Sequence, residues 1–205
     1  MNRKEHWNQV YQTKGPLNVS WYQARPETSL QLIAATGIGL EDELIDVGGG
    51  ASTLVDCLLT AGFQRVSVLD VSAAALVHAR QRLGTRADLA DWFEADVTTF
   101  VPPRPLALWH DRAVFHFLTD PADRRRYVET LSRALISNGH AIIATFSTKG
   151  PSKCSGLEVM QYDAHSISAE LGRRFELVEQ VSENHHTPLE TEQQFSYFLF
   201  RKTEI

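Results

Sequence analysis

Glycines and carboxylates recur in this sequence at the points where short apolar runs end. Asp46 stands just before a turn of three glycines, Gly48–Gly50, which separates an apolar run from a segment of helical period. Asp70 ends the next apolar run, and Asp96 ends the one after it. Glycines let a chain turn tightly and bring its backbone against a ligand, and a carboxylate in the position of Asp70 can accept hydrogen bonds from both hydroxyls of a ribose. The spacing therefore predicts a nucleotide-binding site.

Two kinds of nucleotide suit such a turn. A dinucleotide fingerprint reads G-x-G-x-x-G and sets a helix N-terminus against a pyrophosphate, but Thr53 stands where the third glycine would be. Asp46 would also place negative charge near a phosphate. A cationic ligand without phosphate, such as S-adenosylmethionine (SAM) with its sulfonium and ammonium groups, suits both features. An NAD-dependent oxidoreductase remains the less favoured alternative.

A second group of polar side chains follows the fourth apolar run. Asp111, Arg112 and His116 leave that run at its C-terminal end, where open α/β sheets bind ligands. Asp111 could orient an amine nucleophile or accept a proton, and His116 is a candidate base unless it packs into the following helix. Arg112 could hold an acidic substrate or pair with Asp111. His110 is expected to point away from Asp111, because neighbours in a strand face opposite sides.

The elements that position these groups alternate between strand and helix. Strands are expected at 44–47, 66–70, 92–96, 106–111 and 141–146, with helices at 51–61, 72–83 and 121–136 between them. This alternation predicts an α/β fold with a doubly wound, mostly parallel, seven-stranded Rossmann-like sheet. A helix at 163–171 and two strands at 175–181 and 195–201 should close the sheet as a C-terminal antiparallel hairpin. Adjacent His185 and His186 in the loop between them, and the basic run Arg124–Arg126, are expected to be solvated.

Residues 1–40 differ from the rest and are expected to form an aromatic-rich helical cap on a domain at 41–205. A helix is expected at 26–38, preceded by four aromatic residues, Trp7, Tyr11, Trp21 and Tyr22. The aromatics either pack a helix onto the sheet edge or form a lid that excludes water from the ligand mouth. Trp21 and Tyr22 are the candidate substrate-binding residues.

The segment 44–201 resembles the class I SAM-dependent methyltransferases. The resemblance implies that Asp46 and the glycine turn lie against the methionine part of SAM. It also implies that Asp70, with Val71 beside it, binds the ribose. Ser52 replaces the last glycine often found in the family's turn.

The same resemblance extends to the third and fourth strands. It implies that Asp96 and the backbone of Val97 meet the adenine, and that Asp111 ends the fourth strand beside the methyl group. The implied activity is methyl transfer from SAM to a nitrogen, oxygen or sulfur of a small molecule or a protein side chain, lysine among them. Residues 111–113, Asp-Arg-Ala, resemble both thiopurine-methyltransferase-like enzymes and some seven-strand protein-lysine methyltransferases, so the acceptor stays open. A catalytically inactive SAM-fold scaffold or partner subunit is the other alternative.

Composition excludes several further classes. The 205 residues carry 20 Lys and Arg against 25 Asp and Glu, a net charge of -5, which argues against a nucleic-acid or anionic-membrane binder. No Cys-x-x-Cys or His-x-x-x-His pair predicts a zinc site. The polar start and the lack of a long apolar stretch lead us to expect a cytoplasmic protein with no metal.

Overall fold

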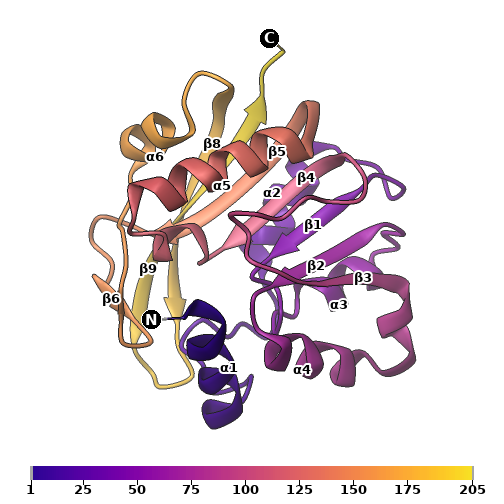
Figure 1. Ribbon diagram of the computed structural model, residues 1–205, viewed down its shortest axis with the longest axis vertical. Coiled ribbons are helices and arrows are strands. Elements are labelled where there is room, and N and C mark those ends of the chain that lie inside the picture. Colours follow the sequence, from indigo (N-terminus) through magenta and orange to yellow (C-terminus); the bar gives the residue numbers. More distant parts are fainter. Residues whose placement is uncertain (1, 205) are drawn as a thin grey trace.

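A seven-stranded sheet forms the centre of the computed structural model, which describes residues 2–204 (Figure 1). Its strand order is β3-β2-β1-β4-β5-β9-β8, and the first five strands in this order are parallel neighbours. The parallel strands are β1 (Leu44–Val47), β2 (Val66–Asp70), β3 (Ala90–Glu94), β4 (Leu106–Arg112) and β5 (Leu135–Phe146). β9 (Glu192–Lys202) lies between β5 and β8 (Phe175–His186) and is antiparallel to both. The predicted fold class and C-terminal hairpin are therefore confirmed.

Two helical layers cover this sheet. One face packs against α5 (Pro121–Ala134) and α6 (Ala164–Leu171). The other packs against α2 (Glu27–Thr36), α3 (Leu54–Thr60) and α4 (Ala73–Leu83). Side chains alternate between the layers along each strand, so Ile45 and Val47 face α5 while Leu44 faces the opposite layer. This alternation decides which side of the sheet each polar residue at a strand end can reach.

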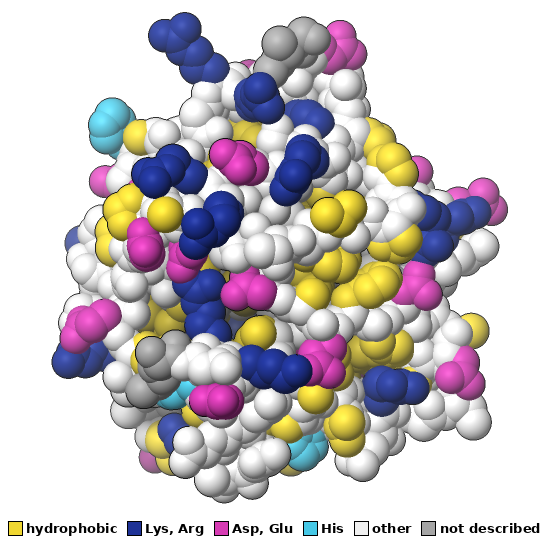
Figure 2. Space-filling view, in the orientation of Figure 1, with side chains coloured by type: hydrophobic (Ala, Val, Ile, Leu, Met, Phe, Trp, Pro, Cys, Tyr) yellow, Lys and Arg dark blue, Asp and Glu magenta, His cyan; other side chains and the backbone are white. Residues whose placement is uncertain are grey.

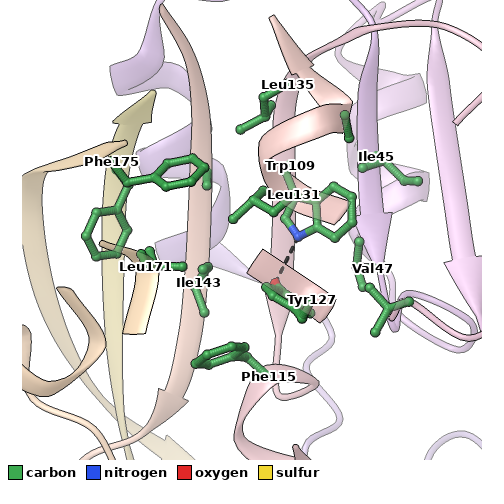
Figure 3. Close-up of a cluster of buried hydrophobic side chains, with 14 of the residues drawn as sticks. Ile45, Val47, Trp109, Phe115, Tyr127, Leu131, Leu135, Ile143, Leu171 and Phe175 are labelled. Atoms are coloured by element: carbon green, nitrogen blue, oxygen red, sulfur yellow. Dashed lines mark hydrogen bonds between the residues drawn. The ribbon is translucent and has the colours of Figure 1, made fainter. Parts of the chain in front are cut away.

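The core beneath α5 contains a polar link among apolar residues. Figure 3 shows the indole Nε1 of Trp109 donating to the hydroxyl of Tyr127 over 2.9 Å, with Leu131 and Phe115 nearby. Both aromatic side chains are fully buried. A buried Trp N–H and a buried Tyr hydroxyl each need a partner. Here the Tyr127 oxygen accepts from Trp109 while its O–H donates to Asp111 of β4, which fixes α5 on β4.

Several element bounds differ from those predicted. α3 begins at Leu54 because the glycine turn extends to residue 53, and β3 ends at Glu94, so Asp96 lies in the turn beyond it. β5 begins six residues earlier than predicted, at Leu135. Short strands β6 (Lys153–Cys154) and β7 (Leu157–Glu158) pair with each other between β5 and α6, where no element was predicted. Short 3-10 helices η1 (Gly84–Leu89) and η2 (Phe115–Phe117) follow α4 and β4.

An additional helix, α1 (Arg3–Lys14), precedes the predicted one. Trp7, Val10 and Tyr11 share one face at i, i+3 and i+4, but the rest of the segment is polar, so periodicity alone is a weak sign of a helix here. Asn2 accepts a hydrogen bond from the Lys4 amide and caps the helix. The signal that could have found it is this asparagine followed three residues later by Glu5, a common arrangement at helix starts.

Two predictions of solvated side chains are wrong. Arg124 is buried, because its guanidinium donates to Glu170 of α6 over 2.7 Å and to the carbonyls of Leu118 and Thr119. His185 belongs to the end of β8 and is buried, with Nε2 2.7 Å from the Ser20 carbonyl. Hydrogen-bond partners outside α5 and outside β8 thus account for the burial of Arg124 and His185, respectively.

Charged side chains of one sign do not cluster on the face of the molecule that Figure 2 shows. Figure 2 shows acidic and basic side chains interspersed there, with apolar side chains between them. Across residues 2–204, no helix is both long enough and apolar enough to cross a membrane. In the same residues, no three His, Cys, Asp or Glu side chains are grouped so as to hold a metal ion.

Candidate functional site

The glycine turn after β1 can be built only from residues without a Cβ. Gly48 has a φ of 70°, and its amide donates to the Leu69 carbonyl over 2.7 Å. A Cβ on Gly49 would collide with the Asp46 carboxylate, and one on Gly50 with the Asp70 carboxylate. The turn therefore runs directly beside the end of β2, with bare backbone against both carboxylates.

Asp70 is buried at the end of β2 and is held by backbone amides. The Gly50 amide donates to Oδ2 over 3.0 Å, and the Ser72 amide donates to Oδ1 over 2.8 Å. Burial raises the pKa of Asp70 to about 6, although these two amides oppose the shift. Each carboxylate oxygen keeps further lone pairs, so the group can still accept hydrogen bonds from a ligand.

Asp96 lies in the turn after β3 and is half-buried. Its Oδ1 accepts hydrogen bonds from the amide and the hydroxyl of Thr98, over 2.8 and 2.7 Å. Its Oδ2 accepts one from Arg3 over 3.1 Å. Burial alone would raise the pKa of Asp96, but the Thr98 bonds and the Arg3 charge hold it below its usual value.

One cavity joins the C-terminal ends of β1, β2, β3 and β4. The predicted cofactor residues that line it are Gly48, Asp70, Val71, Asp96 and Val97. Its other half, which we call the aromatic half, is lined by Arg112, His116, Phe117, Phe146, Cys154, Leu157 and Phe195, with Trp21 at its edge. The structure thus brings together side chains that are far apart in sequence, and Phe146, Leu157 and Phe195 are additions that no sequence motif signals.

Asp46 faces a second, smaller cavity next to the glycine turn. Its Oδ1 lies 2.7 Å from Nδ1 of His110, and Nε2 of His110 lies 2.9 Å from the hydroxyl of Ser29 on α2. All three side chains are buried, and within residues 2–204 Oδ2 of Asp46 has no hydrogen-bond partner. Tyr22 lines this second cavity and not the first. No sequence motif indicated that Ser29 is a partner of His110.

Asp111 lies on the opposite side of β4 from His110, as the strand alternation predicts. It accepts hydrogen bonds from the Tyr127 hydroxyl over 2.6 Å and from the amides of Val114 and Phe115 over 2.9 and 3.1 Å. Burial raises its pKa to about 6, against the effect of the Tyr127 bond. Asp111 is fully buried and does not line the cavity. Through these contacts Asp111 holds the turn that follows β4.

Arg112 does not pair with Asp111, contrary to one of our expectations. Its Nε donates to the Tyr197 hydroxyl over 2.8 Å, and Nη1 donates to the Trp21 carbonyl over 2.8 Å. Its guanidinium carbon lies 4.7 Å from the ring centre of Phe195. The alternation of side chains along β4 sends Arg112 away from Asp111 and toward the N-terminal segment, at the border of both cavities.

His116 lies in η2 and is fully buried at the cavity wall. Its Nδ1 accepts a hydrogen bond from the Phe146 amide over 3.2 Å, so in the neutral ring the proton is on Nε2. Burial, and then the charge of Arg112, lowers the pKa of His116 to about 3. A histidine whose Nδ1 already accepts a hydrogen bond and whose Nε2 carries the proton can donate a hydrogen bond, but it has no free nitrogen that could take a proton. This arrangement therefore does not suit the general base that we expected.

Helix α1 lies across the cavity and supplies its roof. Figure 1 shows α1 next to α4, at the edge toward which the parallel strands point. Trp7 contacts Trp21 and Phe117 edge to face, with ring centres 5.6 and 4.9 Å apart. Arg3 forms ion pairs with Asp96 and with Asp123 of α5.

Further contacts fix the same helix to the sheet edge. Lys4 pairs with Glu94 over 2.5 Å, and Asn8 accepts a hydrogen bond from the Ser72 hydroxyl over 2.8 Å. The Trp21 indole also donates to the Tyr11 hydroxyl over 3.3 Å. Aromatic contacts and ion pairs together therefore close the cavity on this side.

The ion pairs of Arg3 can be tested by replacing it with glutamine. We expect amide hydrogen exchange in α1 to quicken by up to about fivefold, since such partly exposed pairs contribute roughly 0.2–1 kcal/mol. Exchange measured by mass spectrometry over residues 4–14 checks this. The matched control is Arg25→Gln, which removes an exposed pair with Glu27 outside the cavity and should leave α1 unchanged. Unchanged exchange in the Arg3 variant would show that the other contacts of α1 hold the helix without the ion pairs of Arg3.

The sequence and the fold are similar to those of known methyltransferases. Residues 45–143 match the family model described as a methyltransferase domain. The fold is similar to that of the N-methyltransferase NodS from Bradyrhizobium japonicum in complex with S-adenosyl-L-homocysteine, with a TM-score of 0.73 and 19% identity over 96% of this chain and 98% of that one. It is similar to a SAM-dependent methyltransferase from Anabaena variabilis, with a TM-score of 0.75 and 18% identity over 98% and 96% of the two chains.

A third solved structure shares the fold. It is the 1,6-didemethyltoxoflavin-N1-methyltransferase of Burkholderia thailandensis, with a TM-score of 0.68 and 17% identity over 98% of this chain and 84% of that one. No curated protein matches the sequence.

Proposed function

We propose that this chain, whose residues 45–143 match a methyltransferase domain and whose fold is that of SAM-dependent methyltransferases, is itself a class I SAM-dependent methyltransferase. Its acceptor is a small molecule bound in the aromatic half of the main cavity. The observation that carries this proposal is the cavity itself, which joins carboxylates suited to a nucleoside with an aromatic chamber beneath α1. The roof formed by Trp7, Tyr11 and Trp21 favours a small molecule over the side chain of a folded protein.

The cofactor half of the cavity fits SAM in its chemistry. We assign the ribose hydroxyls to Asp70, with Val71 beside it, and the adenine edge to Asp96 and the backbone of Val97. The Gly48 backbone would lie along the methionine part. Oδ2 of Asp46, which has no hydrogen-bond partner within residues 2–204, lies behind the turn and suits a cationic ligand. When bound, SAM supplies a methyl group activated by a positively charged sulfur.

The protein's own contribution is then binding, orientation and exclusion of water. Methyl transfer is a direct displacement, so alignment of the acceptor with the methyl group is the main requirement. Trp21, Phe117 and Phe195 surround the acceptor with apolar surface, which removes water from the reacting atoms. In this proposal Asp111 positions the turn that follows β4, and His116 donates a hydrogen bond to the acceptor molecule.

Binding and transfer can be tested separately. Calorimetry should show that SAM and S-adenosylhomocysteine bind and that NAD binds more weakly or not at all. Cell lysate incubated with the protein and methyl-labelled SAM, then divided into metabolites and proteins, should carry the label among the metabolites. Label on protein would replace the small-molecule proposal with a side-chain acceptor. Absence of SAM binding would favour a scaffold, and tighter NAD binding an oxidoreductase.

A further inference from the structure

The aromatic half of the cavity has walls suited to a flat, apolar molecule. Phe117 and Phe146 each lie against the His116 ring, with ring centres 4.5 and 4.7 Å from it, and Phe195 lies 4.8 Å from Phe146. Trp21 closes the side toward α1. Aromatic surfaces at such spacings favour stacked or edge-to-face contacts with an aromatic ligand.

Two buried N–H groups on these walls have no hydrogen-bond partner within residues 2–204. One is Nε2 of His116, whose proton is fixed there by the bond between Nδ1 and the Phe146 amide. The other is Nη2 of Arg112, whose Nε and Nη1 are bonded to Tyr197 and to the Trp21 carbonyl. Leaving a buried donor unpaired is costly, so both groups are suited to an acceptor atom supplied by a ligand.

The charges around these donors favour an anion over a cation. Among residues 2–204, the carboxylates that line the cavity are Asp70 and Asp96, and both belong to the cofactor half. Glu183 forms an ion pair with Arg112, with Oε1 3.7 Å from Nη2, but it does not line the cavity and also accepts hydrogen bonds from Thr28, Gln23 and Tyr197. An ammonium group in the aromatic half would therefore meet N–H donors and a guanidinium, with no counter-charge beside it.

From this arrangement we propose that the acceptor is a small aromatic molecule with an acidic hydroxyl, bound as its phenolate between Nε2–H of His116 and Nη2–H of Arg112. The proposal rests on the proposed methyl transfer and adds the class of acceptor to it. N–H donors of this kind match an oxygen anion better than a thiolate, since they form short charge-assisted bonds to oxygen.

The chemistry then needs no base from the protein. The hydroxyl loses its proton to water before the phenolate binds, because its charged form is the one that the two donors favour. The phenolate oxygen forms a bond to the methyl carbon while the bond between that carbon and sulfur breaks, and the electron pair of the broken bond stays on sulfur. An anion and a sulfonium cation become a neutral aryl methyl ether and a neutral thioether, so charge and atoms balance.

The probe that tests this is 4-nitrophenol, whose phenolate absorbs visible light while the neutral phenol does not. Titrated against the protein saturated with S-adenosylhomocysteine, the bound probe should show an apparent pKa lowered by about one unit, which is roughly a tenfold preference for the phenolate. His116→Phe keeps the aromatic packing but removes the N–H, and should abolish most of the shift. The control His140→Phe changes a histidine of β5 that does not line the cavity, and should leave the shift unchanged.

The outcomes separate this inference from the proposed function. If calorimetry on the same sample shows no binding of S-adenosylhomocysteine, the methyltransferase assignment itself falls. If that ligand binds but 4-nitrophenol binds as the neutral phenol, or does not bind, only the phenolate proposal falls. Tighter binding of benzylammonium than of 4-nitrophenolate would likewise overturn it, in favour of an amine acceptor. A shift that survives in His116→Phe would remove His116 from the site.

Discussion

Replacing Asp70 with asparagine is expected to weaken SAM binding by about 10- to 100-fold. The carboxylate at the end of β2 would lose its charge, and hydrogen bonds from ligand hydroxyls to a charged acceptor contribute roughly 1.5–3 kcal/mol. Asparagine has nearly the same shape but only one acceptor oxygen, so it keeps the hydrogen bond from one of the two amides of Gly50 and Ser72 and loses the other. Calorimetry with SAM measures the effect directly.

The dependence of this binding on pH provides a second readout. Burial raises the pKa of Asp70 to about 6, so protonation below that value removes the charge that the ligand uses. SAM affinity of the wild type should therefore fall as pH is lowered through about 6, whereas that of Asp70→Asn should stay flat over the same range. Asp91→Asn, which alters an exposed carboxylate of β3 paired with Arg104, is the control and should bind SAM normally. Unchanged affinity in Asp70→Asn would refute the ribose assignment.

Replacing Asp111 with alanine is expected to lower the free energy of unfolding by about 3 kcal/mol. Three donors would lose their acceptor in a fully buried place, namely the Tyr127 hydroxyl and the amides of Val114 and Phe115. An unsatisfied buried donor costs roughly 1–3 kcal/mol, and some of this cost is relieved by relaxation. Urea unfolding followed by circular dichroism measures the change.

A matched control distinguishes this structural role from a catalytic one. Asp120→Ala removes the carboxylate that caps α5, where it accepts a hydrogen bond from the Ala122 amide over 2.7 Å, and should cost only about 1 kcal/mol. If Asp111→Ala unfolds like the wild type but transfers no methyl group, the side chain acts on the reaction, as the family resemblance implied. A stability loss near that of the control would also contradict our reading.

Local signals in the sequence were sufficient for much of the scaffold. The glycine turn, the Ser72 cap of α4 and the Asp120-Pro121 start of α5 are short patterns whose physical meaning depends on adjacent residues. The alternation of side chains along β4 likewise placed His110 and Asp111 on opposite faces. These features could be predicted because each is decided within a few residues of chain.

The site itself depends on contacts that no local pattern encodes. Asp70 and Asp111 both lie near the end of a strand, and the sequence around them does not distinguish their surroundings. Asp70 lines the cavity, whereas Asp111 accepts a hydrogen bond from Tyr127 of α5. Likewise, nothing near His116 indicates that the Phe146 amide occupies its Nδ1. Which partner each polar group meets is decided by the packing of segments far apart in the chain, and this packing changed the roles that we assign to both residues.

The hydrogen bonds between the first 40 residues and the sheet have a consequence for protein engineering. Ser29 bonds to His110, and the carbonyls of Ser20 and Trp21 accept from His185 and Arg112. A chimera that takes its N-terminal segment from a relative, in order to alter acceptor preference, would remove the Ser29 hydroxyl from His110. It would keep the carbonyl acceptors of His185 and Arg112 only if its backbone follows the same course at residues 20 and 21. Such grafts should succeed only when the interlocking positions on β4 and β8 are transplanted with the segment.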